Sequence, residues 1–223
     1  MKKRKLILGT YDTARDGLWT LSALELSDPD YQANFLDVKG KDGPLDLSTA
    51  LTDGVPRYGR RTLTATLECS EGTREDRRDT ISKMINTLDG WRMDIVHPDH
   101  PQHYLSGRVQ VKQLYNDMAH AAVSVTAICD PWLYCRNERS YEVTATTAAQ
   151  ELPLSNRGRR AVVPQAVVTG TGASVKIVRG TLSLALGPGT HKLPDLLLPP
   201  GDTLVTYSGT GSLRISYREA VLR

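Results

Sequence analysis

The segment from His97 to His103 concentrates more potential chemistry than any other part of the chain. It holds the side chains of His97, Asp99, His100 and His103. Imidazole and carboxylate groups are ligand types that Zn²⁺ takes in proteins. However, the spacing is unusual for a single zinc site, two prolines stiffen the segment, and a metal-dependent hydrolase would need further ligands that the sequence does not nominate. We expect a polar loop with no metal and no cofactor.

Other acid–base candidates are no more specific. Carboxylate pairs such as Asp42 with Asp46, or Asp94 with Asp99, are present, but no pattern makes either pair converge on a substrate. Asp42 and Asp46 are expected to cap turns in a glycine-rich segment. No Gly-x-Ser-x-Gly elbow occurs, and Gly170-Thr171-Gly172 has no following helix that could bind phosphate. We predict that the protein is not an enzyme.

The three cysteines are Cys69, Cys129 and Cys135. An odd count without paired spacing favours synthesis in a reducing compartment. Cys69 and Cys129 fall on apolar faces of expected strands, and we expect them to be small core residues.

Alternating apolar and polar residues predict that strands position these side chains. Thr62–Cys69 and Ala121–Cys129 each place one apolar face toward a core, and Trp91, Met93 and Ile95 repeat the pattern. Such strands are typical of an antiparallel sheet covered on one face. The histidine segment lies between expected strands at 91–96 and 104–111, so we predict that it is the tip of a hairpin.

One segment, Arg74–Leu88, predicts a helix. Ile81, Met84, Ile85 and Leu88 share one face. Thr73 is the expected N-cap, and Gly90 can take the left-handed conformation just beyond the end.

The segment Asp28–Asp53 is rich in Gly, Pro and Asp, with turn pairs such as Asp42-Gly43 and Asp53-Gly54. It predicts an ordered loop with tight turns. We expect Leu45 and Leu47 to pin it to the core.

The composition changes near residues 130–142. Thr, Val, Gly and Pro dominate beyond it, and short strands are expected at 141–147, 161–168, 174–178, 181–185, 203–207 and 212–219. Turns at 170–172, 187–189 and 199–201 would separate them, which is typical of a β-sandwich. Pro164 is expected at an edge or between strands.

Composition and charge exclude several classes of protein. The net charge is +3, with 24% charged residues, and neither half has a basic patch interleaved with aromatic residues, so specific nucleic-acid binding is not expected. The basic start of the chain is followed by an apolar run too short for a signal peptide, and no stretch approaches a membrane span.

The order of the N-terminal blocks resembles the siphophage distal tail protein (Dit) family. That family has a Gly-Arg-Asp-Gly-x-Leu-Asp-Leu-like block, a Tyr-x-x-Arg strand, a helix ending near Leu-His/Asp-Gly, and a Tyr-x-Gly-Arg-Val strand. The corresponding segments here are Gly40–Leu47, Tyr58–Arg61, Leu88–Gly90 and Tyr104–Val109.

The second half is also similar to this family. Asn156–Arg160, the strand at Pro164, Leu198–Gly201 and Gly209–Tyr217 look like its C-terminal galectin-like sandwich. The resemblance implies a mainly β protein of the short form, without inserted carbohydrate-binding modules. Residues 1–135 would be a ring-forming antiparallel β-sandwich domain with helix 74–88, and residues 136–223 a galectin-like β-sandwich.

The resemblance implies a structural subunit of a phage or prophage virion, made in the bacterial cytoplasm and located at the distal end of a siphovirus tail. Six copies would form a ring that joins the tail tube to the baseplate hub and carries adhesion or receptor-binding proteins. Implied partners include the tail tube protein, the tape measure protein and a tail-associated lysin or fibre protein. DNA would pass through the lumen unbound, consistent with the slight excess of acidic residues, 19 against 17 basic ones, in residues 1–135.

We expect ring or partner contacts in the turn-rich region 37–61 and in the histidine hairpin. The candidate residues are Asp42, Leu45, Leu47, Tyr58, Arg60, His97, His100 and His103. The alternative is a carbohydrate-binding β-sandwich module. Only Tyr141, Tyr207 and Tyr217 could present aromatic surface in residues 136–223, and packing in the core or at an edge is the better interpretation of all three.

Overall fold

The structure is a computed structural model that describes residues 4–50 and 55–222. It is mainly β, as predicted. Two compact units divide between Trp132 and Leu133, and each is described here by itself. None of the helices among the described residues is both long and apolar enough to span a membrane.

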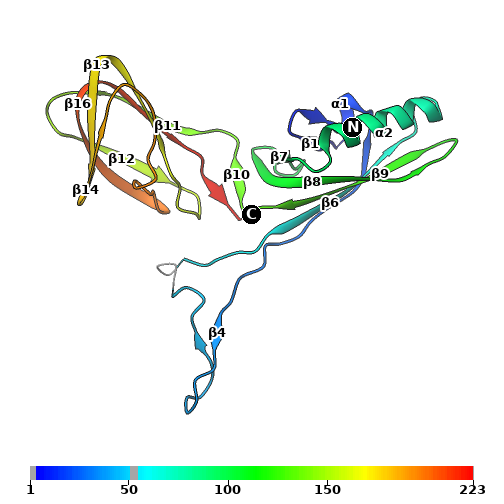
Figure 1. The fold of residues 1–223 in the computed structure, drawn as a ribbon, viewed down its shortest axis with the longest axis horizontal. Helices are drawn as coiled ribbons and strands as arrows, with labels where there is room; N and C mark the ends of the chain where they lie inside the picture. Colours follow the sequence, from blue (N-terminus) through cyan, green and yellow to red (C-terminus); the bar gives the residue numbers. More distant parts are fainter. Residues whose placement is uncertain (1–3, 51–54, 223) are drawn as a thin grey trace. The chain divides into compact units, whose positions relative to one another are not determined.

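Unit 1 is built on a curled antiparallel sheet with the strand order β2-β1-β7-β8-β9-β6-β3 (Figure 1). The strands are β1 (Ile7–Leu8), β2 (Tyr11–Asp12), β3 (Thr20–Leu26), β6 (Arg61–Cys69), β7 (Arg92–Val96), β8 (His103–Asn116) and β9 (Ala121–Cys129). Leu63, Ala65 and Leu67 are fully buried, and so are Val123 and Val125 of the neighbouring strand. The predicted alternation of these strands is therefore confirmed.

Helix α2 (Arg74–Leu88) has the bounds that the sequence predicted, and it packs along β8 and β9. Thr73 caps it: its hydroxyl accepts from the Asp76 N–H at 3.2 Å, and the Asp76 carboxylate accepts from the Thr73 N–H at 2.9 Å. Ile81, Met84 and Leu88 are buried against the sheet. Gly90 follows with φ +77°, as expected.

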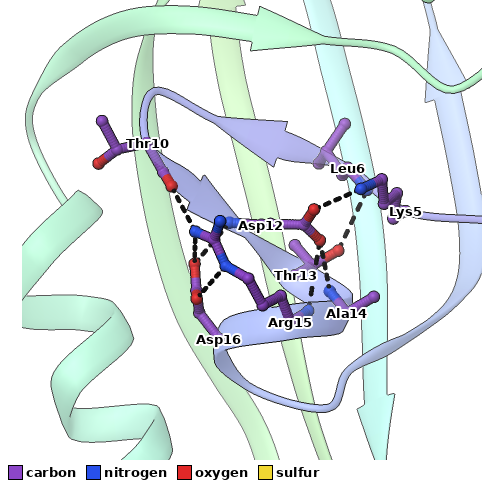
Figure 2. A network of polar contacts seen from close by, with 8 residues as sticks. All are labelled: Lys5, Leu6, Thr10, Asp12, Thr13, Ala14, Arg15 and Asp16. Atoms are coloured by element: carbon purple, nitrogen blue, oxygen red, sulfur yellow. Dashed lines mark hydrogen bonds and ion pairs between the residues drawn. The ribbon is translucent and has the colours of Figure 1, made fainter.

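A second helix, α1 (Thr13–Asp16), was not predicted because it is only four residues long. Figure 2 shows the polar network that holds it. Asp12 accepts hydrogen bonds from the N–H groups of Ala14 and Arg15 and from Lys5 Nζ at 2.5 Å. The fully buried Thr13 hydroxyl accepts from the Leu6 N–H. These contacts all lie within residues 5–16, so the network holds the start of the chain to α1 and needs no further function to explain it.

Two predictions for unit 1 are wrong. Trp91 was placed on the apolar face with Met93 and Ile95, but it precedes β7 and its side chain is 66% exposed. Leu45 and Leu47 do not pin the Gly-rich segment to the core: Leu45 is 37% exposed and Leu47 only half-buried. The predicted turn at Asp53-Gly54 lies outside the described residues.

Unit 2 is a sandwich in which two long strands serve both sheets. β13 (Gln165–Arg179) and β16 (Gly201–Tyr217) pair along both halves, with a register shift between Thr169 and Ser174. β11 (Arg139–Ala145) and β15 (Gly189–Lys192) complete one sheet, and β12 (Gln150–Asn156) and β14 (Leu182–Leu186) complete the other. Short strands β10 (Leu133–Cys135) and β17 (Ala220–Val221) pair with each other.

Glycines permit the bend of both long strands. Each strand carries a Gly-Thr-Gly sequence, 170–172 in β13 and 209–211 in β16, and all four glycines have positive φ. A Cβ on Gly209 would lie 1.9 Å from the carbonyl oxygen of Ser174. The prediction that 170–172 is a turn between separate strands is therefore wrong, because the backbone kinks there and the same strand continues.

Candidate functional site

The candidate residues of the Gly-rich region form a two-stranded extension of unit 1. We call residues 27–50 and 55–60 the arm. It continues the pairing of β3 with β6 through the Ser27 N–H to the Thr62 carbonyl and the Gln32 N–H to the Arg57 carbonyl. Farther out, β4 (Phe35–Leu36) pairs with β5 (Leu45–Asp46). In Figure 1 the arm extends away from the sheet of its own unit.

The arm is an ordered structure with little core of its own. Asp42 lies in the exposed loop between β4 and β5, where Gly40 and Gly43 have φ of +83° and +80°. Asp46 accepts from the Ser48 N–H at 2.8 Å, as expected of a turn-capping residue. Hydrogen bonding from the Ser48 side chain, and then from its N–H, lowers the pKa of the Asp46 carboxyl group. Several large apolar side chains nevertheless face solvent: Tyr31, Phe35, Leu36, Val38, Leu45 and Val55. Exposed apolar groups gathered in this way are typical of a binding surface.

An aromatic chain holds the base of the arm. Tyr58 forms an isolated β-bridge with Tyr31, and their rings meet edge-on at 6.2 Å. The Tyr58 ring also meets Trp132 edge-on at 5.7 Å. Such edge-on pairs add about 0.5–1.5 kcal/mol each beyond burial. Arg60, two residues after Tyr58, is exposed.

A buried arginine marks the point where the arm leaves the sheet. Arg61 is only 2% exposed, and its Nε donates to the Ser27 carbonyl at 2.9 Å. Sequence reasoning missed Arg61 as a structural residue, because a charge at the start of a strand usually faces water. Its alternation with Leu63 and Ala65, both on the buried face, was the available indication.

The histidine segment is a turn at this same end of the sheet. It connects β7 to β8. Gly107, near the start of β8, pairs with Cys129 of β9, and Cys129 pairs on its other side with Arg61 of β6. The turn and Arg61 therefore lie at the same end of the sheet. The His97 Nδ1 accepts from the Asp99 N–H at 3.1 Å, and the His97 and His100 rings lie 5.4 Å apart. His103 begins β8 and is half-buried. The predicted hairpin tip is confirmed.

Burial controls the electrostatics of this turn. His97 is 7% exposed, and desolvation holds its pKa below the usual range, with the charges of His100, Arg4 and Arg61 acting in the same direction and that of Asp99 opposing them. Burial also lowers the pKa of His103. Arg4 donates to both oxygens of Asp99, which lowers the pKa of that carboxyl group. Across residues 4–50 and 55–222, no three His, Cys, Asp or Glu side chains are grouped so that they could hold a metal ion.

The structure thus places the candidates at one end of the unit 1 sheet or on the arm that extends from that end. Tyr58 and Arg60 lie at the base of the arm, the histidine turn shares that end, and Asp42, Leu45 and Leu47 lie farther out along the arm. The arrangement supplies apolar and aromatic surface on a defined backbone, which suits binding to a protein more than a reaction.

The remaining candidates serve the core. Cys69 and Cys129 are buried as predicted, and burial raises the pKa of the Cys129 thiol to about 11. Tyr207 and Tyr217 lie in the core of unit 2. Tyr141 stacks on Tyr217, and its hydroxyl accepts from the Ser155 N–H, so the expected packing of all three tyrosines is confirmed.

The comparison with solved structures identifies the fold. No family model and no curated protein matches the chain by sequence. Among the solved structures that match is the Dit protein (gp 19.1) of phage SPP1, described as a paradigm of the hub adsorption apparatus in phages that infect Gram-positive bacteria. The match has a TM-score of 0.66 at 16% sequence identity and covers 97% of this chain and 98% of that one. The chain therefore has a Dit-like fold along nearly its whole length.

Proposed function

We propose that this protein is a distal tail protein of a siphophage or prophage. The observation that carries the proposal is the fold match to SPP1 Dit, because it spans both units of the chain and leaves almost no residue of either protein unmatched. A shared domain alone would be weaker support, since common β folds host many unrelated functions.

In this proposal six copies form a ring through unit 1, and unit 2 is a galectin-like sandwich that offers a platform for adhesion proteins. The ring joins the tail tube to the tip hub, and DNA passes through its lumen without being bound. The protein is a structural component of the virion, with no catalytic role of its own.

The arm supports a role in assembly. It presents apolar side chains on a hydrogen-bonded backbone, so a partner can bury them without first ordering the chain. A closed ring also needs two different surfaces on each copy, one on either side of the contact. We assign the arm and the histidine turn to contacts between copies or with neighbouring tail proteins.

Native mass spectrometry of the purified 24.6 kDa chain tests the proposal. The expected result is a hexamer, with negative-stain images that show rings with a central hole. If the chain stays monomeric, both alone and when mixed with the tail tube and hub proteins of the same phage, the proposal fails. Glycan-array binding by the monomer would then favour the carbohydrate-binding alternative.

A further inference from the structure

The loop at the end of β12 exposes three arginine side chains within a run of four residues. They are Arg157, Arg159 and Arg160, and we call residues 156–160 the arginine loop. In the part of the chain that the structure describes, no ion pair includes any of these three guanidinium groups. The loop therefore presents three positive charges that the fold itself does not neutralise.

The carboxylates around the loop are engaged elsewhere or stand apart from it. Glu219 pairs with Arg139 at 2.8 Å, and Glu138 pairs with Arg218 at 3.1 Å. Asp202 of β16 lies beside the start of the loop in the strand pairing, but within the described residues it forms no ion pair. Three like charges held close together repel one another, so an anion bound among them would relieve that repulsion.

A buried asparagine fixes the shape of the loop. Asn156 is only 1% exposed. Its Nδ2 donates to the carbonyl oxygens of Arg160 at 2.8 Å and Leu198 at 3.0 Å, and its Oδ1 accepts from the Gly158 N–H at 3.0 Å. One side chain thus closes the loop on itself and attaches it to the core of unit 2, in which Leu198 is fully buried.

The loop is also held against β17 and the residue before it. The Arg159 N–H donates to the Ala220 carbonyl oxygen at 2.8 Å, and the Arg157 N–H donates to Glu219 Oε1 at 2.9 Å. A Cβ on Gly158 would lie 2.6 Å from the Ala220 oxygen, so the main chain approaches β17 as closely as a glycine allows. The backbone beneath the three arginines is therefore ordered before any ligand arrives, which lowers the cost of binding.

Guanidinium groups in this arrangement suit phosphate. Each presents a planar fork of N–H donors that matches two oxygens of a phosphate group. The Arg160 guanidinium is oriented by its hydrogen bond to the Tyr134 hydroxyl at 2.9 Å, which uses one of its five N–H donors. Residues 157–160 span at most about 11 Å, so the loop can meet two or three phosphates spaced along one chain.

The surroundings of the loop do not suit a protein partner. Among the described residues of unit 2, the large apolar side chains that are well exposed are Val163, Leu197 and Leu204, each about half exposed. Three half-exposed aliphatic side chains cannot form the apolar centre of an interface in which each partner buries roughly 800 Å². A ligand of the loop must therefore be held mainly by charge.

A nucleic acid is also a poor fit. Its unpaired bases would need aromatic side chains on which to stack, but none of the four tyrosines among the described residues of unit 2 is exposed. Tyr141 and Tyr217 stack on each other, and Tyr134 accepts the hydrogen bond from Arg160. The exposed groups therefore favour a chain that offers phosphates without bases.

We propose that the arginine loop binds the phosphate groups of a flexible anionic polymer without bases, for which poly(glycerol phosphate) is the simplest probe. The site needs neither a ring nor a tail partner, so it goes beyond the function proposed above. At the end of a phage tail, the loop would give the protein a direct contact with phosphate-bearing polymers on a bacterial surface.

The test compares two variants that lose the same charge from unit 2. The first combines Arg157→Gln, Arg159→Gln and Arg160→Gln. The control combines Lys176→Gln, Lys192→Gln and Arg214→Gln, which replace exposed cations elsewhere in unit 2. Thermal unfolding confirms that each variant is folded. Binding of a fluorescently labelled poly(glycerol phosphate) chain to the full-length protein is then measured by anisotropy over a series of salt concentrations.

The wild type should bind the labelled chain, and the control should bind it within about twofold of the wild type. The loop variant should bind about tenfold or more weakly. It should also lose roughly two units of slope in a plot of log K against log salt, since each phosphate contact contributes about 0.7.

Equal weakening of the two variants would overturn the inference, because net charge alone would then explain binding, and so would a wild type that does not bind. Poly-L-glutamate that competes as well as poly(glycerol phosphate) would assign the loop to an acidic protein instead. DNA of about 20 nucleotides, single-stranded or duplex, that competes about tenfold better would assign it to a nucleic acid. A chain that forms no ring but still binds would count against the proposed function alone, and a hexamer that does not bind would count against the site alone.

Discussion

The Tyr58 ring stands edge-on to the Trp132 indole, with centroids 5.7 Å apart and planes at 82°. Trp132 is the last residue of unit 1, and Tyr58 lies at the base of the arm. The two residues are far apart in the sequence, so this contact ties the arm to the end of the unit that carries it.

Removing the Tyr58 ring should loosen the base of the arm. Tyr58→Ala loses edge-on contacts with Trp132 and Tyr31, each worth about 0.5–1.5 kcal/mol. We expect faster tryptic cleavage after Arg57 and Arg60, measured by mass spectrometry of timed digests. Tyr58→Phe keeps the ring and should be cleaved at the wild-type rate. Equal rates for Tyr58→Ala and the wild type would show that the aromatic chain does not hold the arm.

Leu45→Asp tests the arm as an assembly surface. Leu45 is already partly exposed on the arm, so the change should leave unfolding by urea within about 0.5 kcal/mol of the wild type. A charge buried at the contact between copies should abolish the hexamer in native mass spectrometry. Leu204→Asp is the matched control and should assemble normally. Normal rings from Leu45→Asp would remove the arm from the ring contact.

The histidine turn should make unit 1 less stable in acid. The folded pKa of His97 lies below the unfolded value of 6.5, so the unfolded chain binds more protons. The stability that unit 1 gains from keeping His97 neutral is complete above pH 6.5. It is lost as the pH falls from 6.5 toward the pKa of His97 in the folded chain. Protonation also removes the Nδ1 acceptor of the Asp99 N–H.

The measurement is the free energy of unfolding in urea between pH 8 and pH 5. His97→Asn retains an acceptor but does not titrate, so its stability should fall less steeply over this range. His120→Ala, at an exposed histidine of the β8–β9 turn, should keep the wild-type slope. A wild-type slope in His97→Asn would assign the acid sensitivity to other groups, of which His103 is the first candidate.

Arg77→Met should destabilise unit 1 substantially. The carbonyls of Gly72, Asp117 and Met118 would lose their donor, and a buried group left unsatisfied costs about 1–3 kcal/mol. We expect a loss of roughly 2–4 kcal/mol in urea unfolding, since water reaches part of the turn. Arg78→Met, one position along the helix and exposed, should change stability by less than about 0.5 kcal/mol. Equal effects from the two substitutions would contradict the stabilising role of the Arg77 hydrogen bonds.

Gly209→Ala should prevent unit 2 from folding normally. Its φ is +138°, and the added Cβ would meet the Ser174 carbonyl oxygen at 1.9 Å, a main-chain atom that cannot move aside. Gly187→Ala is the control, because a Cβ there meets nothing within 4 Å. Differential scanning calorimetry should show the loss or a large downward shift of one transition in Gly209→Ala alone. A normal thermogram would mean that the kink can open without cost.

The sequence predicted those elements whose side chains repeat in a regular pattern. Helix α2 was predicted with its cap, because Thr73 and the apolar face of Ile81, Met84 and Leu88 are local features. The faces of β6 and β9 followed from strict alternation.

The errors came where tertiary structure decides the outcome. No local feature of a leucine in a glycine-rich segment distinguishes a solvent-exposed arm from a loop packed on a core. Leu45 was therefore wrongly predicted to pack against the core. The Gly-Thr-Gly sequences have the composition of turns, and only the pairing of β13 with β16 converts them into kinks. Arg61 and Arg77 resemble surface arginines in sequence, yet the fold buries both among carbonyl oxygens.

The sharing of β13 and β16 between the two sheets gives unit 2 a mechanical property. Two separate sheets of a sandwich can move apart when the side-chain packing between them is lost. In unit 2 the main chains of β13 and β16 both run from one sheet into the other and connect the two sheets covalently. A pull on a loop of one sheet is carried covalently into the other, and the kinks must straighten before the sheets can separate. A unit built in this way suits a position under tension.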